Sequence, residues 1–151
     1  MNLTVRYEVD DGSREIELPT ITEMYELEEK LLQLPQIDFQ LVNRFADGLY
    51  ARQVTMQKGA IVTSRIHLKE HFAFIMTGDI SVWTDEDYQR FKAPCVLTTK
   101  PGTKRVLQAH EDTVWITVHA CNAKTQAEAE AELTTNDPEM INRARQQCHS
   151  G

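Results

Sequence analysis

The feature that most constrains the fold is a succession of short segments over residues 49–119 in which apolar and polar side chains alternate. Turn-forming sequences such as "KG", "TGD", "TDED", "KPGTK" and "HED" separate these segments. Alternation with period two is typical of strands with one buried face. Many short strands divided by turns are typical of all-β sandwiches and barrels. The segment therefore predicts a mainly β fold.

Different patterns precede this β segment. Two alternating runs on either side of "DDGS" predict a β-hairpin over residues 3–19. Thr20 and Glu23 have the spacing of a capping box, and apolar residues then recur at helical intervals as far as Pro35. We therefore expect an N-terminal hairpin and helix.

The C-terminal region returns to helical patterns. Thr125 and Glu128 repeat the capping-box spacing, and Pro138 stands where the first turn of another helix is expected. A chain of 151 residues has the size of one domain. We expect a single domain over residues 1–151, made of the hairpin and helix (1–44), the barrel (45–120) and a helical tail (121–151).

Composition excludes several classes of function. No apolar run approaches the roughly 20 residues that cross a bilayer. The first residues lack the pattern of a secretory signal, and the three cysteines are widely spaced, so we expect a cytoplasmic protein with reduced thiols. A net charge of −7 argues against bulk nucleic-acid binding but leaves room for a small anionic molecule in a local positive pocket.

Strand parity predicts a polar set inside the barrel. If "LKE" joins two paired strands, His67 and His71 are cross-strand neighbours. A second hairpin, turning at Glu111 and Asp112, would set Arg105 opposite His119. The residues that parity places on these faces are Arg65, His67, His71, Arg105, Trp115 and His119.

The spacing of these residues resembles the first motif of the cupin superfamily, G-x5-H-x-H-x3,4-E-x6-G. Gly59, Arg65, His67, His71 and Gly78 occupy its five fixed positions. Two residue types differ, because Arg65 stands at a histidine-ligand position and His71 stands at the glutamate-ligand position. Only His67 and His71 therefore carry over as ligands.

A second stretch is similar to the other cupin motif, G-x5-P-x-G-x2-H-x3-N. Gly102 is followed by Arg105 at the histidine position and by Ala109 at the asparagine position, and Pro101 is one residue out of register. The resemblance covers roughly residues 45–120. It implies a jelly-roll β-barrel and a homodimer or higher homo-oligomer. Residues 93–119 also resemble small cupin-like proteins of tailed phages.

Two kinds of site are compatible with these residues. The resemblance implies a divalent transition metal such as zinc, iron, manganese or nickel, held by His67 and His71. His119, which strand parity places on the same side, would complete a three-histidine site. Alternatively, Arg65 and Arg105 offer guanidinium forks for a phosphate or carboxylate, the histidines add donors, and Trp115 stacks on a ring.

Three functional hypotheses follow. The first is a module that binds an anionic small molecule, for example a nucleotide-like one, with a phage-encoded sequestering protein as one version of this role. The second is a metal-dependent oxygenase, isomerase or epimerase. The third is a structural or virion-associated protein whose pocket is vestigial. No nucleophile elbow or Gly-rich phosphate loop supports other chemistry.

Overall fold

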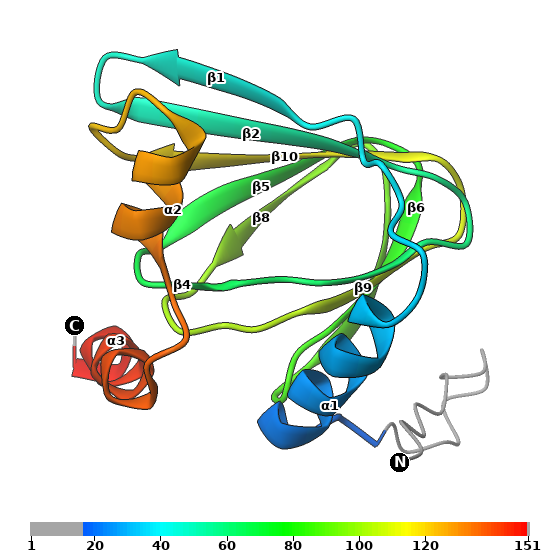
Figure 1. Ribbon diagram of the computed structural model, residues 1–151, viewed down its shortest axis with the longest axis horizontal. Helices are drawn as coiled ribbons and strands as arrows, with labels where there is room; N and C mark the ends of the chain where they lie inside the picture. The colour runs from blue at the N-terminus through cyan, green and yellow to red at the C-terminus, as the bar shows by residue number, and fades with distance from the viewer. Residues whose placement is uncertain (1–16, 151) are drawn as a thin grey trace.

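The computed structural model, shown in Figure 1, describes residues 17–150. The predicted hairpin over residues 3–19 lies outside the described residues, apart from its last three. Within the described part, strands fill most of the chain between residues 42 and 120, and helices lie before and after them. The mainly β class predicted from the alternation is therefore confirmed.

Two antiparallel sheets face each other across the core. The first consists, in spatial order, of β1 (Val42–Ala46), β2 (Leu49–Met56), β10 (Thr113–Ala120), β5 (His71–Thr77) and β8 (Cys95–Thr99). The second consists of β3 (Ile61–Thr63), β9 (Val106–Ala109), β6 (Asp79–Trp83) and β7 (Tyr88–Lys92). Neighbours in space are often distant in sequence, as in a jelly roll, so the predicted cupin-like barrel is confirmed.

In the described part of the chain three helices flank the sheets, and their predicted starts are confirmed. Helix α1 (Ile21–Leu32) has the complete capping box of Thr20 and Glu23. Helix α2 (Gln126–Leu133) begins after Thr125, and α3 (Pro138–Ser150) begins at the proline. Among residues 17–150, none of the helices is long and apolar enough to cross a membrane.

The barrel core lies between the inward faces of the two sheets. Trp115 of β10 stands opposite Val54 of β2 and Ile75 of β5, so one row of the first sheet is apolar. Leu107 of β9 and Val82 of β6 form the facing row of the second sheet. Burial of these side chains gives the barrel its main stabilisation, at about 25 cal/mol per Å² of apolar surface.

The predicted hairpin between Arg105 and His119 is wrong. Strand β9 pairs with β3 and β6, whereas β10 pairs with β2 and β5, so the two strands belong to opposite sheets. The turn at Glu111 and Asp112 crosses the gap between the sheets. Arg105 and His119 still face the same interior, because inward-pointing residues of facing sheets meet in the core.

The predicted hairpin around "LKE" is also wrong. Strand β4 (Ile66–His67) pairs with β11 (Thr134–Thr135), a short strand that follows α2 and was not predicted. The amide of Leu68 donates to the carbonyl oxygen of Leu133 at 2.8 Å and extends this contact. The C-terminal segment therefore closes one end of the barrel beside His67.

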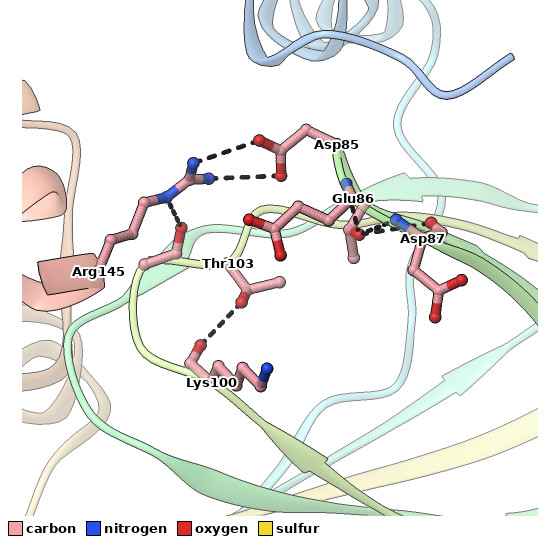
Figure 2. A network of polar contacts seen from close by, with 8 residues as sticks. Asp85, Glu86, Asp87, Lys100, Thr103 and Arg145 are labelled. Atoms are coloured by element: carbon pink, nitrogen blue, oxygen red, sulfur yellow. Dashed lines mark hydrogen bonds and ion pairs between the residues drawn. The ribbon is translucent and has the colours of Figure 1, made fainter. Parts of the chain in front are cut away.

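Helix α3 is held against the barrel by a polar network. Arg145 donates from Nε to the carbonyl oxygen of Gly102 at 3.0 Å and from Nη1 to Asp85 at 3.2 Å, as Figure 2 shows. Gly102 has a positive φ of 79°, and a Cβ there would lie 2.6 Å from Cγ of Arg145. Glycine is therefore required at Gly102 both by the backbone and by the close approach of α3.

Candidate metal centre and ligand pocket

Three histidines from different strands meet at the end of the barrel that α2 and β11 close. The ring of His71 lies 4.3 Å from that of His119 and 4.6 Å from that of His67, measured between centroids. One nitrogen from each ring belongs to a set whose members all lie within 4.8 Å of one another. Nitrogens of a tetrahedral zinc site are about 3.4 Å apart, so small side-chain rotations close the set around one ion.

The tautomer of His71 leaves one nitrogen free. Its Nδ1 lies 3.2 Å from the carbonyl oxygen of Lys69. A carbonyl oxygen can only accept a hydrogen bond, so Nδ1 carries the proton and Nε2 of the neutral ring does not. A backbone carbonyl that fixes the tautomer in this way is typical of metal-binding histidines.

His119 has an unpartnered nitrogen in a buried position. Its side chain is 2% exposed, and Nε2 lies 2.9 Å from Oγ1 of Thr117. Nδ1 is buried and has no hydrogen-bond partner among the described residues. A buried polar atom without a partner is costly, and a bound metal ion would remove that cost. The donor set therefore fits a divalent transition metal ion.

Burial keeps all three rings neutral at physiological pH. Desolvation, followed by the neighbouring His71 and His119, lowers the pKa of His67 from 6.5 to about 3. Desolvation likewise lowers the pKa of His119 to about 3, and that of His71 to about 4. Neutral imidazole is the form that binds a metal, so the rings need not lose protons before binding one.

Two arginines add positive charge to the same cavity. Burial lowers the pKa of Arg105 to about 10, and its guanidinium carbon lies 5.6 Å from the centroid of the Trp115 ring. Arg52 also lines the cavity, and both arginines lower the pKa of His67. Neither forms an ion pair within residues 17–150.

Arg65 occupies a different place from the one that strand parity predicts. Strand β3 ends at Thr63 and β4 begins at Ile66, so the alternation is interrupted before Arg65. The side chain is 64% exposed at the rim of the cavity and lies 3.9 Å from Glu130 of α2. The second interior guanidinium is therefore that of Arg52, not that of Arg65.

Several residues that line the cavity were not predicted from the sequence. Arg52 and Tyr50 precede the predicted motifs, and Glu130 lies in the helical tail. The ring of Tyr50 stacks on that of His119 at 5.8 Å, and the two residues are directly opposite on β2 and β10. The alternation of residues 50–56 contained the signal for Tyr50 and Arg52, since both share the parity of the core residue Met56.

Comparisons with known proteins yield structural matches alone. No family model matches the chain, and none of the curated proteins compared with it matches. A protein from Neisseria meningitidis is 10% identical over 62% of this chain and 95% of its own, with a TM-score of 0.49. A cupin-2 domain protein from Shewanella frigidimarina is 10% identical over 63% and 92%, with a TM-score of 0.47.

A cupin 2 conserved barrel domain protein from Leptotrichia buccalis is also similar. It is 10% identical over 59% of this chain and 44% of its own, with a TM-score of 0.47. Matches at this level of identity and structural overlap assign no activity. The site must therefore be interpreted from its own side chains.

Proposed function

We propose that this protein is a cupin-like small-molecule-binding module that holds one divalent transition metal ion and an anionic ligand inside its barrel. His67, His71 and His119 bind the ion, and Arg105 and Arg52 hold the ligand. The observation that carries the proposal is the convergence of three neutral imidazoles with two arginines that have no acidic partner in the described part of the chain. Trp115, predicted as a ring-stacking residue, contacts Arg105 in the same cavity.

The charge balance supports an anionic ligand. Two half-buried guanidinium groups near a divalent cation repel it and each other, at a cost that an anion between them offsets. The whole chain has a net charge of −7, so this positive interior is a local feature. Zinc, iron, manganese and nickel all accept imidazole ligands, and three histidines leave positions open for another ligand.

Each group has a distinct role in this proposal. The metal ion would supply Lewis acidity at the open position. Lys69 and Thr117 orient the rings of His71 and His119 through their hydrogen bonds. Trp115 provides an apolar surface on which the Arg105 guanidinium packs.

Native mass spectrometry of the protein purified without added metal or chelator tests this proposal. We expect a mass increment of one transition metal ion that is absent from His67→Ala, and an anionic small molecule that is absent from Arg105→Gln. Elemental analysis identifies the metal. Retention of both increments by both variants would contradict the proposed site.

A metal-dependent enzyme, such as an oxygenase, isomerase or epimerase, is the second candidate. The observation that favours it is the number of protein ligands, since three ligands with an open position are typical of catalytic rather than structural zinc. Turnover of the bound ligand in the presence of metal, lost in His67→Ala, distinguishes an enzyme from a binding module.

We also propose that the chain forms a homodimer or larger oligomer through the outer face of the first sheet. Phe72, Met76 and Val96 on this face are 52%, 52% and 57% exposed. Light scattering after size exclusion should give at least twice the mass of one chain. Met76→Glu should reduce it to the monomer, whereas Gln89→Glu on the other sheet should not. A monomeric native protein would contradict the proposal.

Cytoplasmic location and a relationship to phage proteins stay predictions from the sequence. The relationship to phage proteins rests on the resemblance of residues 93–119. Sequestration of a host signal would require both to be correct. The ligand in the native preparation is the direct test of that role.

A further inference from the structure

The residues that line the cavity change from polar to apolar along the axis of the barrel. Its volume is about 220 Å³. Strands β2 and β10 run side by side in Figure 1, and every second pair of opposite residues points inward. From the end closed by α2 toward the core, these pairs are Tyr50 with His119, Arg52 with Thr117, and Val54 with Trp115. Each of these pairs defines one level of the cavity. Successive levels are about 7 Å apart, which is the rise over two strand residues.

The middle level contains two guanidinium groups. Arg52 reaches it from the first sheet, and Arg105 reaches it from the second, where it immediately precedes β9. Nε of Arg105 is buried and has no hydrogen-bond partner among the described residues. A planar guanidinium donates two parallel hydrogen bonds to a carboxylate, and the unpartnered Nε is one of the donors needed for that geometry.

The deepest level is apolar. Trp115 and Leu107 are 5% and 6% exposed, and Val54 and Met56 complete the lining there. A ligand that extends beyond the arginines toward the core must present apolar surface, because a polar group would lose its hydrogen bonds to water without replacement. The aromatic ring of Trp115 favours a flat or aromatic partner.

The size of the cavity limits the ligand further. Pockets that hold drug-sized molecules measure about 300–1,000 Å³, and this cavity is smaller. A nucleotide has a polar base and a ribose in addition to its phosphate, and these would have to enter the apolar level. The cavity therefore disfavours the nucleotide-like ligand suggested by the sequence.

We infer that the ligand is a small monocarboxylic acid with an apolar, flat body, bound with its carboxylate between Arg52 and Arg105 and its body against Trp115. This inference rests on the proposed function, because it specifies the anion that the same cavity holds. It follows from the order of the three levels, with histidines first, arginines second and apolar side chains last.

Isothermal titration with four probes tests the inference on the full-length protein loaded with zinc. 3-Phenylpropionate has both the carboxylate and the apolar body. Propionate lacks the body, 3-phenylpropanol lacks the charge, and adenosine monophosphate represents nucleotides. We expect 3-phenylpropionate to bind at least tenfold more tightly than each of the other three.

Two variants assign the ends of the probe to the levels of the cavity. Arg105→Gln should reduce 3-phenylpropionate binding at least tenfold and leave the weak binding of 3-phenylpropanol unchanged. Trp115→Leu should reduce the advantage of 3-phenylpropionate over propionate severalfold. Thermal melting and zinc stoichiometry confirm that each variant is folded with its metal site intact.

The outcomes separate this inference from the proposed function. Tighter binding of adenosine monophosphate, lost in Arg105→Gln, would overturn the carboxylic acid but support an anion site. Equal binding of 3-phenylpropanol and 3-phenylpropionate would overturn the role of the arginines in recognition. Failure to bind zinc or any of the four probes would overturn both proposals.

Discussion

Replacing His119 by alanine is expected to lower zinc affinity at least ~1,000-fold. The change removes one of the three proposed ligands, and even a residue that only orients a ligand is worth about 10–100-fold in metal affinity. His119 is the ligand with the strongest structural case, because its buried Nδ1 has no hydrogen-bond partner in the described part of the chain. Competition with a chromophoric chelator at fixed pH measures the affinity.

Two further variants make this result specific. Thr117→Val keeps the shape of the side chain but removes the hydroxyl that lies 2.9 Å from Nε2 of His119, so we expect a loss of about 10–100-fold. His110→Ala is the matched control, because its Nε2 lies 2.6 Å from Oγ of Ser81 and it lies outside the three-histidine set. We expect zinc affinity unchanged in His110→Ala. Equal losses in the two histidine variants would indicate adventitious binding.

Strand parity allowed the inward faces to be predicted, but it did not identify the strand partners. The alternation correctly placed Trp115, Thr117 and His119 on one face of β10, because side-chain direction is a local property of a strand. The sheet that the next strand joins depends on packing across the whole barrel. A turn such as that at Asp112 is compatible with either a hairpin or a crossing between sheets. For this reason the two hairpins predicted within the β segment, around "LKE" and at Asp112, were wrong.

The candidate site was also predicted only in part, because side-chain direction could be inferred locally whereas strand pairing could not. His67, His71 and His119 do meet, although His67 reaches the others from a strand that pairs with the C-terminal β11. Arg65 was misplaced, because two irregular residues between β3 and β4 ended the alternation without any proline or glycine to signal it. Arg52 was missed, because no motif includes its position and its proposed role depends on Arg105, which lines the same cavity from the opposite sheet.

Acid should destabilise the metal-free protein over a pH range set by the histidines. Their pKa values are near 6.5 when unfolded, and burial lowers them to about 3 for His67 and His119 and about 4 for His71. Between these values the unfolded chain binds more protons than the folded chain, so stability falls as the pH falls. For each fully titrating group, the free energy of unfolding changes by roughly 1.4 kcal/mol per pH unit.

The expected loss is several kcal/mol between pH 6.5 and pH 4, a large share of the roughly 5–15 kcal/mol that stabilises a typical domain. Urea unfolding of the metal-free protein at intervals across this range measures it. The variant His71→Gln cannot take up that proton, so its stability should fall less steeply than that of the native protein. In the control His110→Asn the slope should match the native one, because His110 lies outside the cluster. If the native protein and His71→Gln lost stability in parallel, carboxylate titration elsewhere would account for the acid sensitivity, and the histidines would not be buried in their neutral form.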